Sequence, residues 1–151
     1  MRNLLFIILM FSFATSFSQN GRNFGEISEG IFENDLDYEL YQCFKDSASK
    51  SATSQCGCYV KSSEQWLVEV NKYNKLILEK LENKAEADFI ASNEAWIKYR
   101  YAEVESAYSI YRDTEQRIDM YHYHERLVEL NRERALVLKR YCDHLNIKYK
   151  N

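Results

Sequence analysis

The sequence predicts an all-α domain: an antiparallel up-down-up bundle of three main helices, preceded by a short helix and stapled by disulfides. The chain has no proline, and its four glycines all lie within the first 57 residues, so residues 58–151 lack both strong helix breakers. Apolar residues recur there at steps of three and four, which is the helical period. Four cysteines in a chain with an export signal indicate disulfides.

Residues 1–18 are predicted to be a signal peptide. Arg2 supplies the positive charge, residues 4–13 are apolar apart from one serine, and Ser16-Phe17-Ser18 has the small-x-small form of a cleavage site. A membrane span needs about 20 apolar residues, so the short run favours a cleaved leader over an anchor. We therefore expect a periplasmic or secreted mature chain without a membrane anchor.

The mature chain is expected to contain a flexible polar segment, 19–31, and one folded domain, 32–151. At the start of that domain, an apolar residue at every fourth position predicts a short helix over 32–45: Phe32, Leu36, Leu40 and Phe44. Residues 46–55 are rich in serine and predict a loop.

Capping-box patterns predict where the three long helices begin: Ser62 with Gln65, Asn83 with Glu86, and Asp113 with Gln116. Each long helix has a predicted buried face. In the first helix it consists of Trp66, Val70, Tyr73, Ile77 and Leu81, and in the last of Leu127, Leu130, Arg134, Val137, Tyr141 and Leu145. In the second helix it consists of Ile90, Ile97, Tyr101, Val104, Tyr108 and Tyr111, flanked by Phe89 and Trp96. Short links between the helices imply antiparallel neighbours.

Charge is unevenly spread along the chain. Residues 23–44 contain six acids and no base, whereas residues 126–151 contain seven bases and three acids. Two interpretations are open. We favour the first, in which the acidic stretch docks on the basic helix of its own chain or is simply solvated. In the second, the acidic stretch forms a face for a basic partner. Removing Arg2 with the leader leaves 19 basic and 23 acidic residues, a net charge of −4. That charge argues against nucleic acid as a partner.

Several short motifs occur in a characteristic order. They are Cys43, Thr53 and Cys58, then Val70-Asn71, then Ala95-Trp96-Ile97-Lys98-Tyr99-Arg100 followed by Ala102-Glu103, and finally Leu130-Asn131-x-x-Arg134-x-x-x-Leu138. This order resembles the LprI family of lysozyme-inhibitor-like domains of bacterial envelope proteins, from Cys43 to about Tyr141. Trp96, Tyr99, Arg100, Leu130 and Arg134 are the motif residues. Two family cysteines are replaced, at Val104 and Arg126, as the loss of one disulfide would leave them.

The resemblance implies a disulfide between Cys43 and Cys58, which would stabilise the domain by roughly 3 kcal/mol. Cys56 competes for the same partner, and the partners of Cys56 and Cys142 stay open. In an up-down-up bundle the helix from Arg126 to Cys142 spans about 24 Å, which sets Cys142 far from Cys56. Free or intermolecular thiols are the alternative, and Cys-x-Cys spacing disfavours structural zinc.

Catalytic chemistry finds no support in the sequence. The sequence has no pattern of a Ser/His/Asp catalytic triad, no Gly-rich phosphate-binding loop and no His-Glu-x-x-His zinc motif. We therefore predict that the protein is not an enzyme and has no cofactor. His122 and His124 are weak metal-ligand candidates: they share a face only if the segment is extended, whereas on a helix His122 faces Glu125 instead. Trp96, Tyr99 and Arg100 suit a recognition site, but a structural unit with Arg100 paired to Glu103 or Glu94 is favoured.

Three functions follow as hypotheses. The resemblance implies an inhibitor that occludes the cleft of a basic c-type lysozyme with an acidic, aromatic surface. The first alternative is a structural or assembly module that binds another envelope protein. The second alternative is a metal-binding exported protein.

Overall fold

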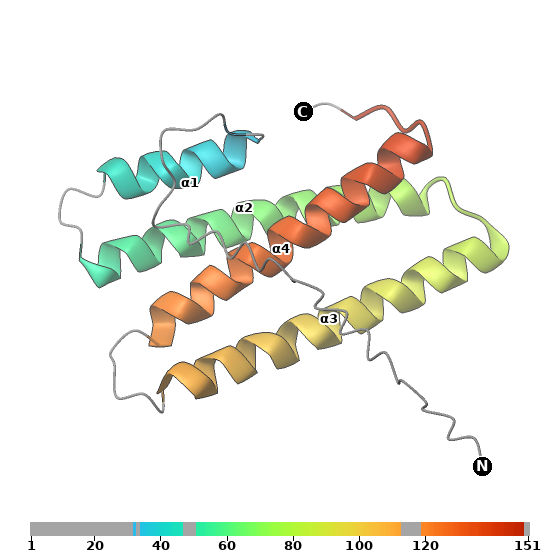
Figure 1. Cartoon of the computed structure of the whole chain (residues 1–151). Coiled ribbons are helices and arrows are strands. Elements are labelled where there is room, and N and C mark those ends of the chain that lie inside the picture. Colours follow the sequence, from blue (N-terminus) through green and yellow to red (C-terminus); the bar gives the residue numbers. More distant parts are fainter. Residues whose placement is uncertain (1–31, 33, 47–50, 113–118, 150–151) are drawn as a thin grey trace, which may run out of the picture. The chain divides into compact units, whose positions relative to one another are not determined.

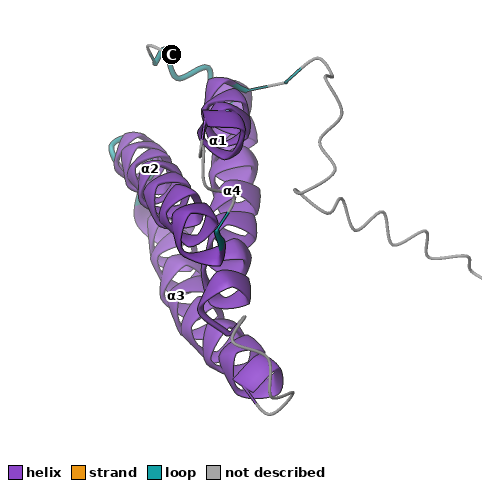
Figure 2. Ribbon diagram, turned by 90° about the vertical axis from the view of Figure 1, so that its left-hand side faces the viewer, coloured by secondary structure: helices purple, strands orange, loops and turns teal. Residues whose placement is uncertain are grey.

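The computed structural model describes residues 32, 34–46, 51–112 and 119–149. They form four helices: α1 (Asp35–Asp46), α2 (Ala52–Leu78), α3 (Asn83–Arg112) and α4 (Asp119–His144). Figure 1 shows α2, α3 and α4 running up, down and up, with the short α1 beside the first half of α2. Figure 2 shows only helices and loops in this part of the chain, so the predicted all-α bundle is confirmed.

The largest contact between helices is that of α2 with α4. In addition, α3 packs on α4, and α1 packs on α2. None of the described helices is long and apolar enough to cross a membrane. The predicted signal peptide, the segment 19–31 and the Asp113–Gln116 cap lie outside the described residues.

Helix α1 begins where the amide of Leu36 donates to the Asn34 side chain at 2.8 Å, which satisfies one free N–H of the first turn. Leu40 is buried, and the Phe44 ring meets the Tyr59 ring of α2 at 5.0 Å. The predicted short helix is thus confirmed within three residues at its start and one at its end.

An ion pair attaches α1 to α4. Both carboxylate oxygens of the buried Asp37 accept from Arg132, at 2.7 to 3.0 Å. A bidentate pair of this kind is stronger and more specific than a single contact. The acidic stretch therefore docks on the basic helix of its own chain at this residue, as the favoured interpretation of the charge distribution expected.

Helix α2 begins ten residues earlier than predicted. Ser51 is its N-cap and accepts from the amide of Ser54 at 3.2 Å, so residues 52–55 are helical and the predicted loop is wrong there. Ser62, the predicted cap, is buried within the helix. Serine is common both in loops and at helix starts, and composition does not separate the two.

The core lies between α2 and α4. The predicted face of α2 is confirmed for Trp66, Val70, Tyr73 and Ile77, which are all buried, but not for Leu81, which lies beyond the end of α2 and is partly exposed. On α4 the buried face differs from the predicted one, and its members are Val128, Leu130, Asn131, Ala135, Leu138 and Cys142. Of the predicted residues, Leu130 is buried but Tyr141 is 48% exposed. The prediction failed because small and polar residues, which carry little apolar signal, fill core positions of α4.

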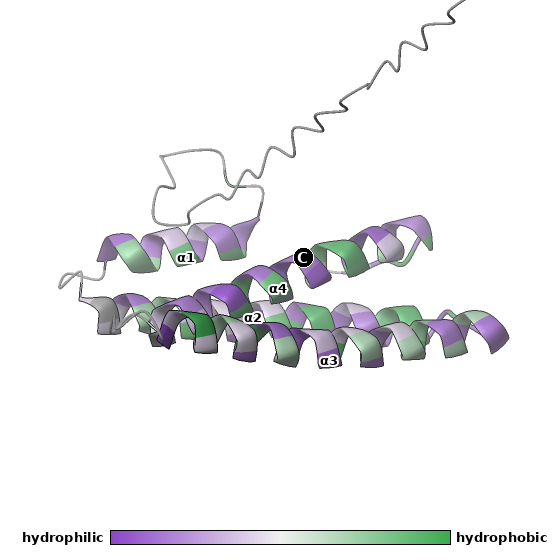
Figure 3. Cartoon of the chain, turned by 60° about the horizontal axis from the view of Figure 1, so that its bottom comes forward, coloured by the Kyte–Doolittle hydropathy of each residue, from purple (hydrophilic) through white to green (hydrophobic). Residues whose placement is uncertain are grey.

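Helix α3 is mostly uncovered. Only Phe89 and Val104 are buried, while Ile90, Ile97 and Tyr101 of the predicted buried stripe are 41%, 46% and 61% exposed. Figure 3 shows hydrophobic residues recurring along this helix. Because α3 packs chiefly on α4 among the described helices, it has one narrow covered face rather than the wide one that a central helix would have.

Candidate functional site

The motif residues converge on the seam between α3 and α4. Arg100 Nε donates to Asn131 Oδ1 at 2.7 Å, and Asn131 Nδ2 donates to the Ser63 carbonyl of α2 at 2.9 Å. The Trp96 ring lies near two guanidinium groups, 5.9 Å from that of Arg100 and 5.6 Å from that of Arg134. Asn131, with no exposed surface, therefore ties three helices together.

This arrangement corrects one expectation. Arg100 hydrogen-bonds the amide of Asn131, and Glu103 pairs instead with Arg126. Trp96 is half-buried at the seam rather than deep in the core, and Tyr99 is 50% exposed and outside the cluster. Trp96 and Arg100 contact other residues of their own chain, but by other contacts than the expected burial in the core and pairing with Glu103 or Glu94.

We predict that Arg100 and Asn131 are energetically coupled. Asn131→Ala should lower the free energy of unfolding by about 2 kcal/mol, because Arg100 Nε loses its acceptor in a partly buried seam. The double variant with Arg100→Ala should lose about 1 kcal/mol less than the sum of the two single losses. Urea unfolding measures all three. Arg100→Ala with Glu94→Ala is the control pair and should be additive; additivity for Arg100 with Asn131 would contradict the predicted coupling.

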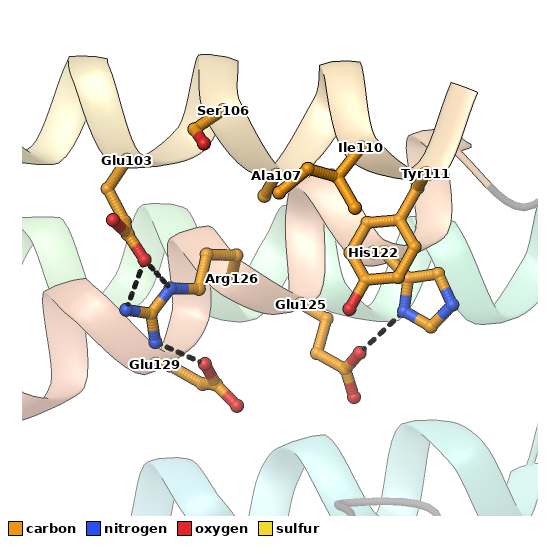
Figure 4. Close-up of a pocket in the computed structure, with 9 residues that line it drawn as sticks. All are labelled: Glu103, Ser106, Ala107, Ile110, Tyr111, His122, Glu125, Arg126 and Glu129. Carbon is orange, nitrogen blue, oxygen red and sulfur yellow. Dashed lines mark hydrogen bonds and ion pairs between the residues drawn. The ribbon is translucent and has the colours of Figure 1, made fainter. Parts of the chain in front are cut away.

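A groove of about 240 Å³ opens along the outer side of the same two helices (Figure 4). Its α3 wall consists of Glu103, Ser106, Ala107, Ile110 and Tyr111, and its α4 wall of His122, Glu125, Arg126 and Glu129. Three carboxylates face one guanidinium, so the lining is net acidic. Ile110, which is 61% exposed, adds an apolar surface. We call this lining the acidic groove.

Arg126 divides the acidic groove by bridging two of its carboxylates. Its guanidinium donates to Glu103 Oε1 at 2.7 and 3.1 Å and to Glu129 Oε2 at 2.7 Å. Burial alone would lower the pKa of Arg126, but the hydrogen bonds to Glu129 and Glu103 raise it above its ordinary value. Each carboxylate keeps further lone pairs, so both can still accept from a second cation.

A network of aromatic and polar groups holds the third carboxylate. Glu125 accepts from Tyr59 at 2.9 Å and lies 3.0 Å from His122 Nδ1. The His122 ring stacks on Tyr111 with centroids 4.0 Å apart, and the Tyr59 and Tyr121 hydroxyls are 3.2 Å apart. Tyr59 is fully buried, and burial raises the pKa of its hydroxyl. The network therefore fixes the position of Glu125.

Cys43 and Cys58 form a disulfide, with their Cα atoms 5.8 Å apart, as the resemblance implied. Cys56 and Cys142 are free thiols. Cys56 Sγ lies 3.8 Å from the carbonyl of Met120 at the start of α4, and 22 residues of helix, about 33 Å, separate Met120 from Cys142. A bond between these two thiols is therefore out of reach. Burial raises the pKa of both, which lowers their reactivity.

The histidine cluster lies within α4, so His122 and His124 point to nearly opposite sides. His122 pairs with Glu125, as the helical alternative expected. Burial lowers the pKa of His124, whose buried Nδ1 has no hydrogen-bond partner. Among the described residues no three His, Cys, Asp or Glu side chains are placed to hold a metal ion.

The family model described as lysozyme inhibitor LprI matches residues 43–138, which is more than half of the chain. The chain belongs to the LprI family. No curated protein and no solved structure matches it. The match begins at the disulfide cysteine Cys43 and ends at the buried Leu138, so it includes the whole motif cluster and the acidic groove.

An ion pair lies beside Val104 and Arg126, the two positions at which the resemblance implied replaced cysteines. Val104 follows Glu103 directly, and Arg126 binds the Glu103 carboxylate at 2.7 Å. Because Glu103 is on α3 and Arg126 on α4, the pair joins the two helices. An ion pair with a quarter or more of each side chain exposed is weaker than a covalent link, but it leaves charge in the groove.

The acidic groove was not predicted from the sequence. Glu125 and Glu129 lie four residues apart on α4, and such spacing places them on one face of a helix. That signal was present, but their approach to Glu103 depends on how α3 and α4 pack. Tyr59 was missed as well, since the segment before Ser62 was not expected to be helical.

Proposed function

We propose that this domain is an exported, non-catalytic inhibitor that binds a basic lysozyme through the acidic groove and so occludes the lysozyme's cleft. The family supplies the class of activity. The acidic lining of the groove is the single observation that supports it as the surface that binds lysozyme. Both apply to the mature chain, which we propose is released outside the cytoplasm when its leader is removed.

The groove suits a positively charged side chain. Glu103, Glu125 and Glu129 are held in place by internal hydrogen bonds, so they lose little freedom when a cation binds. A lysine or arginine entering from solvent would add charge-assisted hydrogen bonds, and its aliphatic stem would lie against Ile110. Net charge of −4 on the mature chain also steers a basic protein toward it.

We predict that Ser106→Arg weakens inhibition at least about tenfold. Ser106 is exposed on the α3 wall, and an arginine there would neutralise the groove and occupy the place of the partner's cation. The concentration needed for half-inhibition of peptidoglycan lysis by c-type lysozyme should rise at least about tenfold, which is the size expected for loss of a charge contact.

Ser92→Arg is the matched control, because Ser92 is exposed on the same helix about 21 Å from Ser106 and outside the groove. It should inhibit like the unsubstituted protein. Undiminished lysis at micromolar excess of the unsubstituted protein would remove the inhibitor proposal. Equal inhibition by both variants would remove the groove as the binding surface while leaving the activity.

A further inference from the structure

Helix α3 carries exposed apolar side chains beyond Ile110 and Tyr111, which line the acidic groove. Six of the ten large apolar side chains exposed in the described part of the chain are on this helix: Ile90, Ile97, Tyr99, Tyr101, Ile110 and Tyr111. Contiguous exposed apolar surface on a water-soluble domain marks a contact with another protein. Among the described helices α3 packs chiefly on α4, so these side chains remain exposed for contact with another protein.

Three of these side chains form one strip. At about 100° per residue, Ile90, Ile97 and Tyr101 fall within an arc of about 40° on α3. Ser106 and Ile110, which line the acidic groove, lie on the other flank of the helix, at least about 140° from Tyr101. A protein bound on this strip would therefore leave the groove open.

Two charged residues beside the strip, Lys98 and Glu105, have opposite charges and would face each other if a second α3 lay antiparallel against the first. Lys98 and Glu105 lie within about 60° of Tyr101, both are exposed, and neither forms an ion pair with another described residue. They are equally spaced about the midpoint between Tyr101 and Ala102. A second α3 laid antiparallel on that midpoint thus brings each Lys98 opposite a Glu105.

We propose that a second copy of this chain binds here, forming a two-fold symmetric dimer through antiparallel α3 helices. Ile97 and Tyr101 of both copies pack at its centre, and Lys98 of each copy pairs with Glu105 of the other. A two-fold interface requires a surface that complements itself, and Lys98 with Glu105 meets that requirement on either side of a central pair of Tyr101 side chains. A different protein partner would need no such symmetry.

The size of the contact sets its strength. In this register residues 91–112 of each α3 overlap, a length of about 33 Å, so a strip about 10 Å wide buries roughly 660 Å² counted over both copies. Stable dimers generally bury more than about 1,200 Å². We therefore expect a reversible dimer with a dissociation constant in the micromolar range or weaker.

Charge reversal tests this geometry. In sedimentation velocity of the mature protein from ~5 µM to ~1 mM, the unsubstituted chain should pass from monomer to dimer. Lys98→Glu places two carboxylates opposite each other, and Glu105→Lys two ammonium groups, so each variant alone should dissociate about tenfold more readily. The two variants mixed should form a heterodimer, because every opposed pair then has opposite charges.

Lys80→Glu is the control: it makes the same change of charge at an exposed residue outside α3 and should associate like the unsubstituted chain. Circular dichroism should show unchanged helicity in all variants, since the substituted side chains are exposed. A chain that stays monomeric at ~1 mM would overturn the proposal. So would a mixture of Lys98→Glu and Glu105→Lys that associates no better than either variant alone, whatever the outcome of the lysozyme assay.

Discussion

Trp66→Ala should lower the free energy of unfolding by about 4 kcal/mol, the range found when a fully buried tryptophan is truncated. Trp66 is 1% exposed in the middle of α2. The Arg132 guanidinium lies 5.8 Å from the centre of its ring, and Asp37 of α1 holds that guanidinium from the other side. Truncation therefore leaves a cavity and also removes the surface on which the ion pair between α1 and α4 rests.

Trp96→Ala is the matched control, since it deletes the same side chain at a half-buried position on the seam of α3 and α4. Its loss should be about 2 kcal/mol, because much less surface is removed from water on folding. Urea unfolding followed by circular dichroism compares the two variants. Equal losses, or a larger loss for Trp96, would contradict the assignment of the core to α2 and α4.

Removing the disulfide with the double substitution Cys43→Ser and Cys58→Ser should cost about 3 kcal/mol, the chain-entropy value for a loop of this length. The bond links α1 to α2 across 15 residues. Without it α1 is held by few groups, chiefly Leu40, the ring contact of Phe44 with Tyr59, and the ion pair of Asp37. We therefore expect part of the loss as detachment of α1 before the rest of the bundle unfolds.

Thermal unfolding with and without a phosphine reductant measures this effect. The unsubstituted protein should become as unstable as the double variant when reduced, and the double variant should not respond to reductant. Cys56→Ser is the control, because this thiol makes only a weak contact with the Met120 carbonyl, and its loss should be small. A reduced protein as stable as the oxidised one would show that α1 is held by its packing.

Together the two variants separate the contributions to stability. Trp66 belongs to the contact of α2 with α4, which any arrangement of this bundle must keep. The disulfide acts mainly on the unfolded chain, whose freedom it restricts, and on the attachment of α1. The motif residues Trp96, Arg100 and Arg134 contribute at a third place, the seam between α3 and α4, where Asn131 connects them to α2.

The sequence by itself determined the fold class, the family, and the face of α2 from Trp66 to Ile77. Residues after 57 contain no proline or glycine to interrupt a helix, and the apolar residues recur there at the helical spacing of three and four, which selects helix over strand. The order of short motifs sufficed for the family, since it depends on residue types and spacing alone.

Only the tertiary structure decided which face of α3 is covered, and therefore where a partner can bind. The stripe of Ile90, Ile97 and Tyr101 has the period of a buried face, yet among the described helices α3 packs chiefly on α4 and turns Trp96 and Arg100 toward it. Periodicity reports that a helix has an apolar side, whereas the number and position of neighbouring helices decide whether that side is covered. For the same reason, Glu103 meets Arg126 and Glu129 only once α3 and α4 pack together.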